Sequence, residues 1–397
     1  MNPESSLQKQ FVACLEQVLR NARKPVSLHE PEFAGNEWHH VKDCIDSGWV
    51  SSVGKYVDEF ESRIADITGA KHAVAVVNGT TGLHVALHAA GVGAGDEVFV
   101  PALTFVATAN AVSHCGAVPH FIDSEDRTFG MDPCALAARL ADVAEPVAGG
   151  GYRNRLTGRR LAGVVPMHVF GQPMAIEALV EIAGRYALPV VEDAAESLGS
   201  FVSGRHTGTF GSMGVFSFNG NKIVTTGGGG AIVTDDPALA RRLKSLTTTA
   251  KRPHPWEFVH DETAFNYRMP NLNAALGCAQ LEQLPGMLRR KRLLASAYAK
   301  AFDGYPAFAY TEPSEGNCWL NSVRLTDASL DVRDSVLQAS VDAGYHCRPV
   351  WRLMHRLPMY EGCPRGALLV AEALERELIN LPSSAFLADG MATEADR

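Results

Sequence analysis

The chain has 397 residues, enough for two or three domains at about 150 residues each. Hydrophobic residues make up 46% and charged residues 20%, which is ordinary for a globular protein. The 36 Lys and Arg against 44 Asp and Glu give a net charge of −8, which argues against a general nucleic-acid-binding or anionic-membrane surface. No apolar stretch approaches the roughly 20 residues of a membrane span, and the N-terminus lacks the pattern of a secretory signal.

Eight cysteines are scattered along the chain without a CxxC pair or a zinc-like grouping. A protein of this size needs no disulfide framework, so we expect reduced, mostly structural thiols, no metal site and a cytoplasmic location. Glycine is frequent, at 36 residues, and gathers in a few segments. Such segments suggest a ligand that is bound through the backbone.

Short β-rich runs alternate with helical stretches along most of the chain, after an opening amphipathic helix whose apolar residues run from Phe11 to Leu19. The predicted strands are 73–77, 97–101, 118–123, 161–168, 189–193, 214–218 and 231–234. The predicted helices between them are 80–90, 104–114 and 175–186. This alternation predicts an α/β fold with a doubly wound, mostly parallel sheet, and the short link before the last strand allows one antiparallel strand.

The pattern changes near Asn271. Residues 271–303 predict long helices that are interrupted at Pro285, and mixed strands and helices follow. We therefore expect an N-terminal helical extension (1–27), a large domain (28–284) and a smaller C-terminal α+β domain (285–397), with a cleft between the two domains.

Three motifs at strand ends suggest chemistry, and the first is Asn78-Gly79-Thr80-Thr81-Gly82, between a predicted strand and a helix. The free N–H groups and the positive dipole end of a helix make such a junction an anion site. The alternative is a simple capped turn.

The second motif is Glu192-Asp193, at the end of the strand PVVED. Carboxylates at the carboxyl ends of strands face the ligand crevice of open α/β sheets. A half-buried carboxylate there needs a cationic or hydrogen-bonding partner, and a protonated pyridine nitrogen is one such partner. The alternative is an Asp that caps a helix.

The third motif is Ser217-Phe218-Asn219-Gly220-Asn221-Lys222, followed closely by the four glycines 227–230. Partial desolvation would make this lysine a competent nucleophile toward an aldehyde. The alternative is a surface turn with an incidental lysine. An anion cradle, a buried carboxylate and a reactive lysine together are the parts that pyridoxal phosphate requires.

Several segments across nearly the whole chain carry a resemblance to one family. They are NGTTGLHVAL (78–87), PALTFVATANA (101–111), VPMHVFGQP (165–173), VEDAAESLGS (191–200), FSFNGNK (216–222) and FNYRMPNLNAALG (265–277). On these motifs the chain resembles the DegT/DnrJ/EryC1/StrS family of pyridoxal-phosphate-dependent sugar aminotransferases, which have the fold-type I architecture. NGTTGLH, DAAESLGS and RPVWRLMHRLPMY further resemble the branch that makes 4-amino sugars for legionaminic-acid-type pathways.

The resemblance implies the roles of the cofactor-binding residues. Lys222 would hold the cofactor and move the proton, and Asp193 would keep the pyridine nitrogen protonated. The phosphate cradle would consist of Gly79, Thr80 and Ser217.

The resemblance also implies contacts around the ring and between subunits. Phe105 would stack on the ring, and Glu196 stands beside it where many relatives have His or Gln. Asn266 would reach the phosphate of a partner subunit, in a homodimer with shared active sites.

Trp49, Ser52 and Arg348 are candidates for contacts with the sugar substrate. Trp49 and Ser52 lie in a segment that resembles the substrate-side loop of the family. Arg348 would meet a carboxylate or a diphosphate, or else form an interdomain salt bridge.

The implied reaction moves an amino group from glutamate to C4 of a nucleotide-linked 4-keto-6-deoxy sugar, in surface-polysaccharide or nonulosonic-acid-type biosynthesis. The branch points to UDP-2-acetamido-2,6-dideoxy-4-ketohexose, with a GDP- or dTDP-linked ketosugar as the alternative. A dehydratase of the same fold has histidine in place of the lysine, so Lys222 argues against that activity. A cofactor-binding regulator without catalysis is the alternative from another class.

Overall fold

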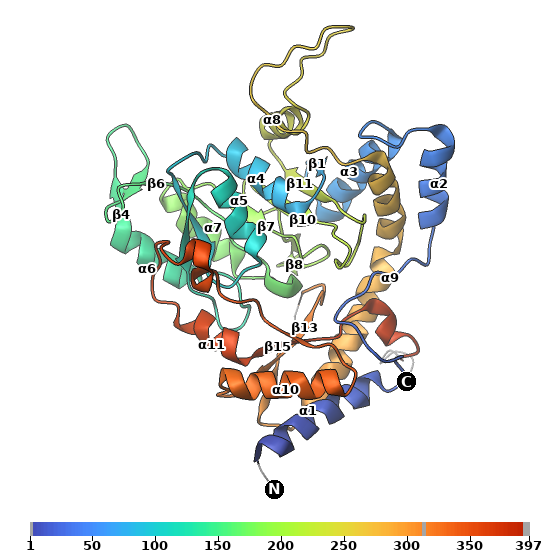
Figure 1. Ribbon diagram of the computed structural model, residues 1–397. Coiled ribbons are helices and arrows are strands. Elements are labelled where there is room, and N and C mark those ends of the chain that lie inside the picture. The colour runs from blue at the N-terminus through green and yellow to red at the C-terminus, as the bar shows by residue number, and fades with distance from the viewer. Residues whose placement is uncertain (1–2, 312–314, 392–397) are drawn as a thin grey trace.

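The computed structural model describes residues 3–311 and 315–391, and Figure 1 shows their arrangement. The N-terminal part consists of three helices: α1 (Pro3–Leu19), α2 (Glu37–Ser47) and α3 (Lys55–Thr68). The predicted amphipathic opening helix is confirmed, because the α1 residues Phe11, Cys14 and Leu15 are all buried. Within the described residues, no helix is both long and apolar enough to cross a membrane.

The centre of the molecule is a sheet of parallel strands with one antiparallel member. Its strands are β1 (His72–Val76), β2 (Glu97–Pro101), β3 (Val118–Ile122), β6 (Arg160–Val164), β7 (Val191–Asp193), β10 (Met213–Ser217) and β11 (Gly230–Thr234). One half has the order β1-β11-β10-β7 and the other contains β3-β2-β6, and parallel bridges from Val164 to Val190 and from Met167 to Asp193 join them. The antiparallel strand is β11, as the short glycine-rich link allows.

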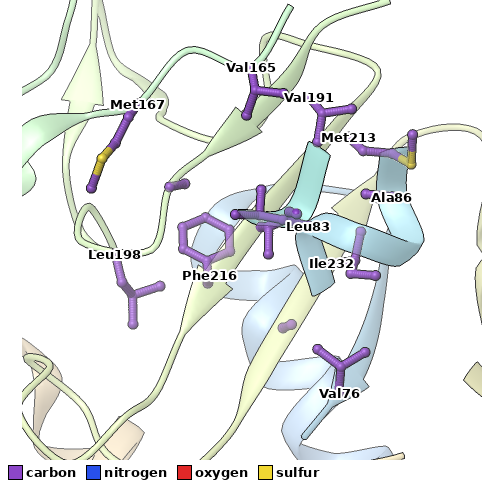
Figure 2. Packing of buried hydrophobic residues seen from close by; sticks show 14 of the residues in the cluster. Val76, Leu83, Ala86, Val165, Met167, Val191, Leu198, Met213, Phe216 and Ile232 are labelled. Atoms are coloured by element: carbon purple, nitrogen blue, oxygen red, sulfur yellow. The ribbon is translucent and has the colours of Figure 1, made fainter. Parts of the chain in front are cut away.

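Helices cover both faces of this sheet because successive strand residues point to opposite sides. In β2, Val98 and Val100 belong to the same apolar cluster as residues of α4 (Gly79–Ala89) and α5 (Val106–His114). Phe99 between them belongs to a cluster with α6 (Pro133–Val143) and α7 (Ile176–Arg185). Figure 2 shows the first cluster, where Leu83 and Ala86 of α4 lie against sheet residues such as Ile232. The fold is therefore the predicted α/β, fold-type I architecture.

Short elements surround the sheet. They are β4 (Ala144–Pro146), β5 (Tyr152–Asn154), β8 (Phe201–Val202), β9 (Arg205–His206), η1 (Val169–Gly171) and α8 (Pro237–Thr247). Antiparallel β4 and β5 border the exposed glycines 149–151, so the segment before β6 lies at the surface.

A single helix, α9 (Asn271–Phe302), connects the large sheet to the C-terminal part. The predicted interruption at Pro285 is wrong, because the helix continues through this residue. Proline costs a helix one hydrogen bond, but Leu284 and Met287 on either side are buried and hold both halves in place. The proposed domain boundary at 284/285 falls within this continuous helix.

The C-terminal part is an α+β unit, as predicted. It consists of β12 (Phe308–Tyr310), β13 (Asn321–Leu325), α10 (Leu330–Asp342), β14 (Arg348–Pro349), η2 (Met354–Arg356), η3 (Pro358–Tyr360), α11 (Leu369–Glu377), β15 (Leu378–Leu381) and η4 (Ala385–Ala388). Its sheet order is β12-β13-β15-β14. Helix α1 lies beside α10 (Figure 1), and Phe11 shares an apolar cluster with Phe302 and Val323. The N-terminal extension thus packs on the C-terminal part.

Candidate active site

The three sequence motifs meet at the carboxyl-terminal ends of neighbouring strands. Strands β7 and β10 run parallel, with Asp193 opposite Val215, so both end at the same edge of the sheet. At the start of α4, a Cβ atom on Gly79 would lie 3.0 Å from the Cβ of Ser217. Two parts of the predicted phosphate cradle are therefore in direct proximity.

Strand alternation separates the two adjacent carboxylates of β7. The Glu192 side chain is fully buried and accepts hydrogen bonds of 2.6–2.8 Å from three backbone N–H groups of residues 208–211. It also lies 3.0 Å from Nε2 of His168, which is itself a buried core residue. Glu192 therefore holds a turn, and Asp193 is the carboxylate on the other side.

Asp193 is buried with hydrogen-bond donors but without a basic side chain in direct contact. Thr108 donates to its Oδ2 at 2.6 Å and the Ala195 N–H to its Oδ1 at 3.2 Å. Among the described residues, no Lys or Arg nitrogen forms an ion pair with it. Burial raises the pKa of Asp193, and the positive charge of Lys222 opposes that rise. No helix begins at Asp193, so the alternative role as a helix cap is wrong.

Lys222 forms an ion pair with Glu196 inside the protein. Its Nζ lies 3.0 Å from Glu196 Oε1, and the two side chains are only 12% and 1% exposed. The other carboxylate oxygen of Glu196 accepts a hydrogen bond from the Phe170 N–H at 2.9 Å. Burial raises the pKa of Glu196 to about 7, although Lys222 acts in the opposite direction. The alternative of an incidental surface lysine is therefore wrong.

The strand–helix junction at Asn78 is a capped turn, and its role as an anion site stays a prediction. The Asn78 side chain caps α4 by accepting from the Thr81 N–H at 2.8 Å, so the capped turn is present. The first N–H groups of a helix have no partner within the helix, which leaves those of Gly79 and Thr80 suited to an anion. The last of the four glycines 227–230 packs against this junction. A Cβ on Gly230 would lie 2.8 Å from the backbone carbonyl carbon of Asn78, which is too close for a side chain.

Phe105 presents an open aromatic face beside this site. It stands at the N-terminal end of α5 and is 46% exposed. Its ring centroid lies 6.0 Å from that of Trp351, whose ring is 4.8 Å from that of Phe170. A half-exposed ring in this position suits the predicted stacking on a cofactor.

Pyridoxal phosphate fits these residues. The group needs an anion site, a carboxylate for a ring nitrogen and an amine for its aldehyde. In the described part of the chain the buried Asp193 has no cationic partner, a Cβ on Gly79 would crowd Ser217, and Lys222 is a shielded amine.

The single chain does not bring Asn266 to this site. In the described part of the chain, the exposed Asn266 accepts from the Arg268 guanidinium at 3.0 and 3.1 Å, with no contact to Lys222, Asp193 or Ser217. This arrangement is consistent with a role toward a second subunit, which stays a prediction.

The three predicted substrate contacts stay predictions as well. The Trp49 ring is 58% exposed, while its backbone oxygen accepts from Asn271. Ser52 is half-buried. Arg348 is exposed and donates to the Cys347 carbonyl, and within the described residues it has no carboxylate partner, so the alternative of an interdomain salt bridge is not found.

Sequence reasoning missed three residues that hold the site. Thr108 fixes Asp193, Asn317 donates to the Glu196 and Leu198 carbonyls, and the Trp319 ring lies under Lys222. Thr108 lies within the quoted segment PALTFVATANA, so its position was visible but its partner was not. The segment around Asn317 and Trp319 carried no motif.

The family profile of the DegT/DnrJ/EryC1/StrS aminotransferases matches residues 31–394. A GDP-perosamine synthase of Caulobacter vibrioides is 38% identical over 377 residues, covering 94% of this chain and 95% of the relative. EpsN of Bacillus subtilis, a putative pyridoxal phosphate-dependent aminotransferase, is 36% identical over 341 residues and covers 85% and 84%.

Solved structures of the same fold are also similar to this chain. The aminotransferase TlmJ from Streptoalloteichus hindustanus is 28% identical with a TM-score of 0.81, covering 94% of this chain and 95% of TlmJ. DesI, solved in the presence of its TDP-sugar product, is 30% identical with a TM-score of 0.78, covering 91% and 88%. The chain therefore belongs to the DegT/DnrJ/EryC1/StrS family and is a pyridoxal-phosphate-dependent nucleotide-sugar aminotransferase.

Proposed function

We propose that this enzyme transfers an amino group from glutamate to C4 of a GDP-linked 4-keto-6-deoxy sugar. The observation that carries the chemistry is the buried Lys222–Glu196 pair beside the buried carboxylate of Asp193. The preference for GDP is supported by relatives of 34–38% identity that are GDP-perosamine synthases. These relatives do not support the legionaminic-type branch, which had pointed to a UDP-linked acetamido sugar. The cytoplasmic location stays a prediction.

Each site residue has a defined task in this proposal. Pyridoxal phosphate, when bound, supplies an aldehyde that captures amines and a ring that accepts electrons from the reacting carbon. Gly79, Thr80 and Ser217 bind its phosphate, Phe105 orients its ring, and Asp193 holds a proton on its nitrogen. Their positions at strand ends and a helix start keep them rigid.

Lys222 moves the proton of the reacting carbon in this proposal. Its Nζ lies 3.0 Å from Glu196 Oε1, which is within the distance for direct proton transfer. Because the pKa of Glu196 is raised to about 7, this carboxyl can both take and return a proton near neutral pH. The shielding of both side chains limits access of water to this exchange.

The test is transfer of label from ¹⁵N-glutamate to GDP-, UDP- and dTDP-linked 4-ketosugars. We expect labelled amino sugar with the GDP-linked substrate at the highest kcat/KM. Lys222→Ala should lower the rate about a thousandfold or more because the nucleophile is lost. Lys42→Ala, which changes an exposed lysine paired with Asp46, is the control and should keep normal activity.

Two outcomes would separate the levels of the proposal. Preference for the UDP-linked acetamido sugar would overturn the nucleotide and keep the reaction. Absence of label in every ketosugar, with the cofactor bound, would overturn glutamate-dependent amination of C4.

A further inference from the structure

The side chain of Lys222 is enclosed by two different groups. Its Nζ lies 4.0 Å from the centroid of the Trp319 ring and 3.0 Å from Glu196 Oε1. The indole Nε1 of Trp319 donates to the carbonyl oxygen of Asn221 at 2.8 Å, directly before Lys222 in the chain. Trp319 is only 4% exposed, so the aromatic face is shielded from water. A cation over a desolvated indole is attracted by the ring electrons.

Trp319 is itself held rigidly by buried polar contacts. The backbone N–H of Trp319 donates to Asn317 Oδ1 at 2.8 Å. The side-chain amide of Asn317 in turn donates to the backbone carbonyl of Glu196, also at 2.8 Å. Residues 317–319 therefore contact both members of the Lys222–Glu196 pair. They come from the C-terminal part of the chain, whereas Glu196 and Lys222 lie in the segments that follow strands β7 and β10 of the large sheet.

A second buried lysine, Lys291, forms hydrogen bonds to the backbone of the segment 317–319. Lys291 of α9 is fully buried and donates to the carbonyl oxygens of Trp319 at 3.1 Å and Ser383 at 2.5 Å. Burial lowers its pKa to about 7. Lys291 thus ties the Trp319 backbone to the end of the C-terminal sheet, and the reaction described above makes no use of it.

We propose that Trp319 is a positioning residue that stabilises the free ammonium of Lys222, the state in which the lysine is not bonded to the cofactor. This proposal rests on the proposed role of Lys222. The attraction needs a charged amine. When the amine gives its proton to Glu196 and condenses with an aldehyde, one water leaves and the ammonium is lost. Trp319 therefore favours the released lysine over the bonded one.

This role has an unusual consequence for cofactor affinity. A Lys222 nitrogen that had bonded to the aldehyde of pyridoxal phosphate and given its proton to Glu196 would no longer carry the charge that the indole attracts. Pyridoxamine phosphate has no aldehyde, so the ammonium stays on the indole before and after binding. Removal of the ring should therefore strengthen binding of the aldehyde form and leave the amine form unchanged.

Calorimetric titration of the apoenzyme with both cofactor forms tests this difference. In Trp319→Leu we expect the Kd for pyridoxal phosphate to fall by up to about tenfold, the size of a shielded cation–π contact. The Kd for pyridoxamine phosphate should stay within about twofold. Trp319→Phe, which keeps a ring without the indole N–H, should give an intermediate Kd. Trp38→Phe, at a residue that is 75% exposed on α2, is the control.

The possible results distinguish the role clearly. Weaker binding of both cofactor forms by Trp319→Leu would mean that Trp319 only supports the fold. Unchanged binding of both forms would mean that the contact between Trp319 and Lys222 does not affect cofactor affinity. Either result overturns the proposal. Lys222→Ala tests separately whether Lys222 bonds to the aldehyde. If this variant no longer binds pyridoxal phosphate more tightly than pyridoxamine phosphate, Lys222 is the residue that bonds to the aldehyde, whatever the role of Trp319.

Discussion

The buried carboxylate of Asp193 is held by a hydroxyl and a backbone donor, and no described residue forms an ion pair with it. Thr108 donates to Oδ2 at 2.6 Å, and Thr104 lies 2.6 Å from the Thr108 hydroxyl. A carboxylate held this way is fixed in position and is not neutralised by an ion pair. It therefore remains free to form an ion pair with the protonated ring nitrogen of the cofactor.

We predict that Thr108→Val destabilises the apoenzyme by about 1–3 kcal/mol, because a buried acceptor loses its partner in an isosteric change. The cost should grow with pH. Asp193 has a folded-state pKa above its ordinary 3.8, so its contribution to stability falls as pH rises from that value, and the Thr108 hydrogen bond opposes this shift.

Urea unfolding of both proteins at several pH values measures this effect. Thr326→Val, which removes an exposed hydroxyl bonded to the Pro306 carbonyl, is the control and should cost within about 0.5 kcal/mol. A cost that is the same at every pH would contradict the account of Asp193.

At the scale of elements, the close packing of α4 on the sheet positions the phosphate cradle. A Cβ on Gly82 would lie 2.8 Å from Val215 Cγ1 of β10 and 3.3 Å from Val76 Cγ2 of β1. The first distance is shorter than real Cβ contacts and the second is tighter than most, so a side chain here would have to displace Val215 or move α4 away from the strands. The same approach brings Gly79 to Ser217.

Gly82→Ala should therefore destabilise the protein by about 1–3 kcal/mol through overpacking. Gly184→Ala is the matched control, because this exposed glycine of α7 has no atom within 4 Å of an added Cβ. Alanine there should stabilise by about 0.5–1 kcal/mol through helix propensity. Denaturant midpoints of the two variants should move in opposite directions, and a shift of both in one direction would refute this explanation.

The sequence was informative where local pattern decides structure. The strands that end in Asp193 and Ser217 are apolar runs followed by polar residues, so their ends and their chemistry were visible. Contacts between distant residues were not: Thr108 lies 85 positions from Asp193, and Trp319 lies 98 positions from Asn221. Pro285 misled for a related reason, since tertiary packing of α9 outweighs the local cost of proline.

At the scale of the whole molecule, one feature favours a second copy of the chain. The segment 249–263 projects beyond α8, away from the body of the protein (Figure 1), and carries Trp256 and Phe258 at 76% and 78% exposure. Exposed aromatic side chains of this kind are typical of subunit contacts. Asn266, which we propose to complete the partner's phosphate site, lies three residues after the end of this segment.

A shared site predicts complementation between two damaged subunits. Lys222→Ala should be inactive and Asn266→Ala strongly impaired, because each removes part of every site. When the two variants are unfolded together and refolded, about a quarter of wild-type activity should return, because half of the dimers are mixed and each mixed dimer has one intact site. No gain over the separate variants would show that Asn266 serves its own subunit.

The central claim is that Lys222 is the lysine that binds the cofactor. Borohydride reduction of the enzyme with pyridoxal phosphate makes the lysine–cofactor bond permanent, and peptide mass spectrometry then locates it. The structure offers Lys291 as a competing buried lysine, with a pKa lowered to about 7 by burial. We predict that the label lies on Lys222 alone, and a label on Lys291 or on any other lysine would contradict this assignment of the active site.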